Sequence, residues 1–175
     1  MPRAISALRV LSGLELGEPH WYADAVEAVL EAGEFDRVLG SLHSLPDQGG
    51  YGDIAGLSHH RDPTEVARSY LAEVAVLVTS SQAFDTLAHI DYPVRDWPES
   101  AGPFDPYDFE DEFRHALLLA AASGRALEIN TRVPLDTTIL RWWHQEGATP
   151  SPLAAAHTIP STIGDASTEV RAARE

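Results

Sequence analysis

The chain has 175 residues, a length that suits one soluble domain with a hydrophobic core, and its formal net charge is -15. The negative charge argues against nucleic acid as a partner, since no cluster of basic residues offsets it. The chain has no cysteine and no apolar run long enough to cross a bilayer, which excludes disulfides, thiolate metal sites and a membrane span. We therefore predict a cytoplasmic protein without a membrane partner.

The pattern of apolar and polar residues predicts strands and helices in alternation. The predicted strands cover residues 8–16, 37–41, about 84–91 and 126–130, and the predicted helices run from Pro19 to Gly33 and over residues 62–79, 108–123 and about 135–146. This order predicts an α/β fold built on a parallel sheet or barrel.

The first two strands carry polar groups near their ends. Glu15 is the one charge of the first strand, and a carboxylate in that position is costly unless it is paired or binds a cation. His43 follows the second strand directly. The glycine-rich loop 46–60 is longer than ordinary connections, which indicates either a lid or a disordered insert. Its adjacent residues His59 and His60 are better interpreted as solvated than as ligands of one ion.

The third strand gives the clearest chemical signal. It ends in His89 and Asp91, Pro93 stops it, and Arg95 lies in the loop just beyond, before an irregular, proline-rich connection over residues 97–107. Ligands bind at the carboxyl ends of parallel strands, so His89 is either a site residue or a single hydrogen-bonded core histidine. Asp91 is expected to orient His89 or to cap the following turn.

The last part of the chain lacks a further strand. The fourth strand is followed by Arg132, and after the last helix Pro150 and Pro152 exclude a central strand, because proline cannot donate to a ladder. We therefore predict one domain over residues 1–147 and an irregular or disordered tail over residues 148–175.

Glu15, His43 and His89 stand at equivalent places in three successive strands. If the strands lie side by side, these side chains converge on one rim of the sheet. Two imidazoles and one carboxylate are a common ligand set for zinc, manganese or iron. The alternative treats each residue as an isolated buried polar group that the backbone satisfies, and the three equivalent positions favour the shared metal site.

Four short segments stand out in this sequence: residues 13–15, 38–43, 87–91 and 127–130. They resemble motif regions of the polymerase and histidinol phosphatase (PHP) domain family, and most nearly its histidinol-phosphatase branch. The resemblance covers roughly residues 8–146 and implies part of a distorted (β/α)7 barrel, a TIM-like fold that holds up to three metal ions and hydrolyses phosphate monoesters. On that pattern Glu15 bridges two metals, and His43 and His89 complete one of those metal sites.

The family pattern is incomplete in this sequence. No His-x-His motif comes before the first matching segment, and the late Ser-Asp-Ala-His segment of the family corresponds to residues 154–157, where Ala155 replaces the metal-binding acid and only His157 is kept as a candidate ligand. Fewer ligands weaken metal binding. As a hypothesis, the chain is an incomplete gene product with a missing start and a shifted reading frame in its tail, which sequencing of the locus would test.

The resemblance implies a metal-dependent phosphomonoesterase that acts on histidinol phosphate, a small phosphate ester of histidine biosynthesis. Arg95 and Arg132 lie just past strand ends and are the candidate catalytic residues that bind phosphate, with a solvated loop arginine as the alternative for each. A second hypothesis is a catalytically inactive metal-binding or interaction protein. A third is an unstable fragment that exposes apolar helix faces.

Overall fold

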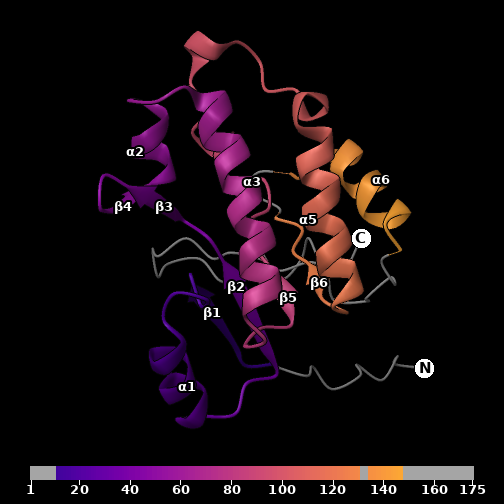
Figure 1. Cartoon of the computed structure of the whole chain (residues 1–175). Coiled ribbons are helices and arrows are strands. Elements are labelled where there is room, and N and C mark those ends of the chain that lie inside the picture. Colours follow the sequence, from indigo (N-terminus) through magenta and orange to yellow (C-terminus); the bar gives the residue numbers. More distant parts are fainter. Residues whose placement is uncertain (1–10, 131–133, 148–175) are drawn as a thin grey trace, which may run out of the picture.

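The structure, a computed structural model, describes residues 11–130 and 134–147 (Figure 1). Its main sheet has four parallel strands in the order β1-β2-β5-β6. The strands are β1 (Gly13–Gly17), β2 (Arg37–Ser41), β5 (Thr86–Leu87) and β6 (Ala126–Leu127). The longer helices are α1 (Ala23–Glu31), α3 (Pro63–Ser80), α5 (Glu110–Ala122) and α6 (Thr137–Gln145). The predicted α/β fold with a parallel sheet is confirmed, and within the described residues the sheet is open, with β1 and β6 at its edges.

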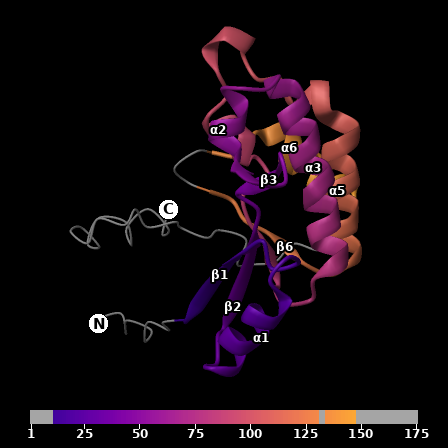
Figure 2. The ribbon, with the colours of Figure 1, turned by 60° about the vertical axis from the view of Figure 1, so that its left-hand side comes forward.

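Helices α3 and α5 lie side by side along one face of the sheet and form the core with it (Figures 1 and 2). The core residues are buried aliphatic and aromatic side chains, among them Val66, Tyr70, Val74, Leu77, Leu87, Phe113, Leu117 and Leu127. Gly40 in β2 allows the closest approach, because a Cβ atom there would lie 2.4 Å from the ring of Phe84. The ends of the strands are therefore held in register by tight packing beneath them.

Helix α3 begins where the sequence predicts. The carboxylate of Asp62 accepts hydrogen bonds from the backbone N–H groups of Thr64 and Glu65, at 2.8 and 3.3 Å, and Pro63 occupies the first helical position. At the far end of α5, Gly124 has a φ of 73°, the left-handed conformation that commonly ends a helix. These local signals explain why the limits of both helices could be predicted.

The loop predicted over residues 46–60 is ordered, so its interpretation as a disordered insert is wrong, whereas its interpretation as a lid stays a prediction. It contains the antiparallel hairpin of β3 (Ser44–Asp47) and β4 (Gly50–Asp53), followed by the short helix α2 (Ile54–Ser58). The two hairpin turn residues both have positive φ, as in a type I′ turn. His59 and His60 follow α2 and are exposed, as expected for solvated residues.

The first helix begins later and is less buried than predicted. It starts at Ala23 rather than near Pro19, and Val26 is its one buried residue, while Tyr22 just before it and Val29 within it are largely exposed. Pro19 belongs instead to the turn after β1. The side chains of the next two residues, His20 and Trp21, form hydrogen bonds with Glu73 of helix α3. The apolar stripe of this segment therefore does not form a core face within the described part of the chain.

The segment after β5 also differs from the prediction. The strand ends at Leu87, and Pro93 and Arg95 lie in a short helix, α4 (Tyr92–Arg95), rather than in a loop. The connection that follows contains two 3-10 turns, η1 (Glu99–Ala101) and η2 (Pro106–Phe109). A parallel pair of only two residues per strand is enough here, because apolar side chains on both sides bury the strand ends.

None of the described helices has the length and apolar character needed to cross a membrane. The tail predicted over residues 148–175 lies outside the described residues.

Candidate metal centre

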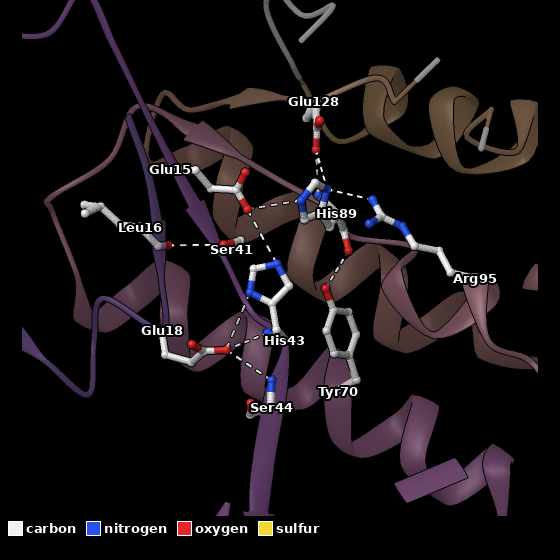
Figure 3. Close-up of polar contacts among 10 residues, drawn as sticks. All are labelled: Glu15, Leu16, Glu18, Ser41, His43, Ser44, Tyr70, His89, Arg95 and Glu128. Carbon is white, nitrogen blue, oxygen red and sulfur yellow. Dashed lines mark hydrogen bonds and ion pairs between the residues drawn. The ribbon is translucent and has the colours of Figure 1, made fainter. Parts of the chain in front are cut away.

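Three side chains from separate strands meet at one end of the sheet (Figure 3). Glu15 lies within β1, and His43 and His89 come just after β2 and β5. The Oε1 atom of Glu15 is 3.5 Å from Nε2 of His43 and 3.2 Å from Nε2 of His89. The structure thus brings together the three residues that the sequence places at strand ends, although Glu15 is inside its strand rather than at the end.

The arrangement fits a divalent cation. One potential ligand atom of each of the three residues lies within 4.8 Å of the others, and no other group of this kind occurs among the described residues. The two imidazoles present the same ring nitrogen to a single carboxylate oxygen. This nitrogen and oxygen donor set suits zinc, manganese or iron, and three protein ligands leave positions open for water or a substrate.

His89 has an unusual backbone conformation, with a φ of 54°. A non-glycine residue keeps this left-handed conformation only where its surroundings hold it. The hydroxyl of Tyr70 donates to the His89 carbonyl at 2.5 Å, and the backbone N–H of His89 donates to Oε2 of Glu128 at 3.1 Å. The same Oε2 atom lies 2.7 Å from Nδ1 of the ring, and both side chains of this pair are almost fully buried.

His43 is held in a similar way by Glu18, which comes just after β1. Oε1 of Glu18 accepts hydrogen bonds from the backbone N–H groups of His43 and Ser44, at 2.6 and 3.1 Å, and lies 3.9 Å from Nδ1 of His43. Glu18 itself has a φ of 46°, and its backbone N–H donates to the carbonyl of Ser41 at 2.8 Å. Each candidate ligand histidine therefore contacts one further carboxylate behind it.

The charges of the site shift the pKa values of its members in opposite directions. Hydrogen bonds with His43 and then His89 hold the pKa of Glu15 far below its usual range, although partial burial opposes this. Burial lowers the pKa of His89, but hydrogen bonds with Glu128 and Glu15 outweigh it and raise the pKa to about 9. Burial raises the pKa of the Asp91 carboxyl. In the folded chain without a metal, the proton on His89 thus compensates the carboxylates that it contacts.

Arg95, a predicted phosphate ligand, lies beside this cluster. Its Nη2 atom is 2.8 Å from Nδ1 of His89, and its guanidinium stacks over the ring of Tyr92 at 4.9 Å. Its Nε atom is buried and has no hydrogen-bond partner among the described residues. The other predicted site residues, Arg132 and His157, lie outside the described residues.

Sequence reasoning missed three residues of this site. Glu128 follows β6 directly and is a lone charge in an apolar run, the same signal that marked Glu15. Glu18 gave no comparable signal, because a glutamate before a proline in a turn is common. Tyr70 fits the apolar face of α3 and was expected to be core, which it also is. Asp91, by contrast, makes no side-chain cap hydrogen bond on α4 within the described chain.

Comparisons with known proteins agree with this fold. No protein-family model matches the chain. A histidinol-phosphatase of Lactococcus lactis subsp. lactis is 25% identical over 126 residues, which cover 72% of this chain and 46% of the relative. A probable histidinol-phosphatase of Clostridium acetobutylicum is 28% identical over 124 residues, covering 71% and 48%. The chain thus spans about half the length of the relatives it matches.

Solved structures show the same fold. The crystal structure of histidinol phosphate phosphatase from Lactococcus lactis, in complex with zinc, L-histidinol and phosphate, matches with a TM-score of 0.66 and 20% identity over 77% of this chain and 53% of that one. A putative histidinol phosphatase from Listeria monocytogenes matches with a TM-score of 0.59 and 17% identity over 78% and 57%. The chain is thus similar in sequence to histidinol phosphatases over about half of their length, and it shares the fold of these two solved structures.

Proposed function

We propose that the chain works as a metal-dependent phosphomonoesterase of the histidinol-phosphatase type, with histidinol phosphate as its substrate. The observation that carries this proposal is the convergence of Glu15, His43 and His89 on one point at the strand ends. The proposal is supported by the likeness to the Lactococcus lactis enzyme, whose structure holds zinc, L-histidinol and phosphate. A cytoplasmic location and the division of the chain at residue 147 stay predictions from the sequence.

In this proposal the three clustered residues hold the cation. The chemistry that a divalent cation supplies when bound there is Lewis acidity toward a phosphate oxygen and activation of water at neutral pH. Glu15 contributes a carboxylate that stays ionised, and the two histidines contribute Nε2. Arg95 would donate hydrogen bonds to phosphate oxygens, which its guanidinium can do in pairs, and its unpartnered Nε supports that role. Arg132 and His157 are proposed as a second phosphate contact and a further metal ligand.

The test is release of inorganic phosphate from histidinol phosphate in the presence of zinc or manganese. We expect turnover with the full chain and a loss of at least about 100-fold in Glu15→Gln, because this isosteric change removes the shared anionic ligand. Arg95→Ala should raise KM more than Glu15→Gln does, since it removes a substrate contact but leaves the metal ligands. If the unchanged chain released phosphate no faster than Glu15→Gln, the proposed hydrolase activity would be wrong.

A metal-binding protein without turnover is the second candidate. It is favoured by the finding of a single three-residue ligand cluster within the described residues, since phosphatases of several metals need more ligands. This candidate predicts about one zinc ion bound per chain, lost in Glu15→Gln, together with no release of phosphate. Metal analysis of the purified protein, run beside the phosphate assay, separates the two candidates.

A further inference from the structure

We propose that Glu128 is a positioning residue that aims His89 at the metal centre, and that Glu18 has the same role for His43. This inference rests on the metal site of the proposed function. Neither glutamate belongs to the cluster of three ligands. Each lies against Nδ1 of a ligand histidine, whereas Glu15 faces Nε2 (Figure 3).

The two glutamates contact their histidines through the same pair of atoms. Oε2 of Glu128 lies 3.1 Å from the backbone nitrogen of His89 and 2.7 Å from its Nδ1. Oε1 of Glu18 lies 2.6 Å from the backbone nitrogen of His43 and 3.9 Å from its Nδ1. One carboxylate oxygen thus binds the main chain of each ligand, and that of Glu128 also lies within hydrogen-bond distance of the ring. In each case Nε2 is left to face Glu15.

The contacts around His89 decide which of its ring nitrogens is left to bind a metal ion. Nδ1 lies 2.7 Å from Glu128 and 2.8 Å from Nη2 of Arg95, and one nitrogen cannot donate to a carboxylate and accept from a guanidinium at once. A lone pair facing a carboxylate oxygen at 2.7 Å would be repelled. Nδ1 therefore donates its proton to Glu128, and Nε2 is the nitrogen that can bind a metal ion once its own proton is released.

The same carboxylate holds a conformation that His89 would not adopt alone. The residue has a positive φ, and its N–H and carbonyl are fixed from opposite sides by Glu128 and Tyr70. Glu128 has only 1% of its side chain exposed, so water does not compete for these hydrogen bonds. Removing the carboxylate charge would free both the ring and the backbone of this ligand, and metal binding would then have to restore their order.

The experiment compares zinc affinity, measured by competition with a chromophoric chelator, in the full chain and in Glu128→Gln. The variant is isosteric, and we expect it to bind zinc about 10- to 100-fold more weakly, as is usual when the partner of a ligand histidine is lost. Glu18→Gln should weaken binding less, because its oxygen is farther from the ring. Equal affinity in the full chain and in a folded Glu128→Gln would overturn the proposal.

The chain offers a matched control in Glu73→Gln. Glu73 also accepts from a buried histidine, at 2.9 Å from Nε2 of His20, but this pair lies outside the metal cluster. The zinc affinity of Glu73→Gln should stay within about twofold of that of the unchanged chain, whereas loss of the partner of a metal ligand, as in Glu128→Gln, should cost about 10- to 100-fold. A loss in Glu73→Gln as large as that in Glu128→Gln would show a general effect on the fold and refute a positioning role.

A second measurement does not depend on the folding of any variant. Nitrogen-15 spectra of the unchanged, zinc-loaded protein report which ring nitrogen of His89 carries a proton and which binds the metal, and we expect a hydrogen-bonded proton on Nδ1. An unprotonated Nδ1 would overturn the proposal. Zinc binding without phosphate release contradicts only the proposed hydrolase, whereas phosphate release with unchanged zinc affinity in Glu128→Gln contradicts only the positioning role.

Discussion

At the scale of single residues, the centre depends on one carboxylate shared by two imidazoles. Glu15 is about one-third exposed, whereas the side chain of His89 is almost completely buried, so the cluster opens toward solvent on the glutamate side. A cation or water can therefore approach from that side, while Glu128 closes the other. The proton that His89 holds in the metal-free protein is the direct competitor of a metal ion.

This competition predicts that zinc affinity rises with pH. Because the pKa of His89 is raised to about 9, its ring carries an extra proton at pH 7 that metal binding must displace. We expect the apparent affinity to rise about tenfold per pH unit from about pH 6 to 8 and to level off above about 9, with about one proton released. Calorimetry in buffers of different ionisation enthalpy measures that proton directly.

The raised pKa of His89 affects the stability of the metal-free fold in the opposite direction, because this stabilisation decreases as the pH rises. A raised histidine pKa stabilises the metal-free fold fully below pH 6.5, the ordinary pKa value, and this contribution is lost as the pH rises through about 9.

The competition between zinc and this proton would be contradicted by a zinc affinity that stays constant between pH 6 and 8, with no proton released. Glu15 adds no pH dependence in this window, because its pKa is lowered and it stays ionised.

At the scale of secondary-structure elements, Arg125 joins the end of α3 to the start of β6. Its guanidinium donates to the carbonyls of Val78, Ser81 and Phe84, and it lies over the Phe84 ring at 4.1 Å. The side chain is buried, and burial lowers its pKa. A cation at a helix C-terminus satisfies carbonyls that the helix leaves unpaired and interacts favourably with the helix dipole.

We predict that Arg125→Met lowers the free energy of unfolding by roughly 2 to 4 kcal/mol, because buried carbonyls lose a charged donor. Urea unfolding followed by circular dichroism measures the change. The control is Arg68→Met, since Arg68 pairs with Glu112 at the surface, where such pairs contribute less than about 1 kcal/mol. Equal stability of the two variants would mean that the contacts of Arg125 contribute little.

At the scale of the whole molecule, the candidate metal site lies between parts of the chain that are far apart in sequence. The candidate ligands come from β1 and from the segments after β2 and β5, and these strands are short. The chain also carries a net charge of -15, which repels itself in the compact state. A bound cation should reduce this repulsion and fix three strand ends together.

We therefore predict that zinc at about 100 times its Kd stabilises the fold by about 2.7 kcal/mol and raises the Tm by roughly 5 to 10 °C. Differential scanning calorimetry measures the shift, with Glu15→Gln as the variant that should show none. A single cooperative transition without metal would contradict the hypothesis of an unstable fragment. An equal shift in Glu15→Gln would mean that zinc stabilises the chain at another place.

The sequence by itself predicted most of the longer elements of this protein and the three residues that the structure brings together as candidate metal ligands. The cap at Asp62, the left-handed Gly124 and the alternation of strands and helices are local signals, and they act through neighbouring residues. Glu15 and His89 could be found because a polar group at the end of an apolar strand is costly without a partner. These inferences needed no knowledge of which strands pair.

The tertiary structure alone decided how the ligands are held. His89 takes a left-handed conformation because Glu128, 39 positions later in the chain, binds its N–H and ring. The hairpin formed by β3 and β4 likewise depends on pairing between two segments with weak strand preference. Contacts between distant residues form only when the whole sheet is assembled, so no local pattern in the sequence could predict them.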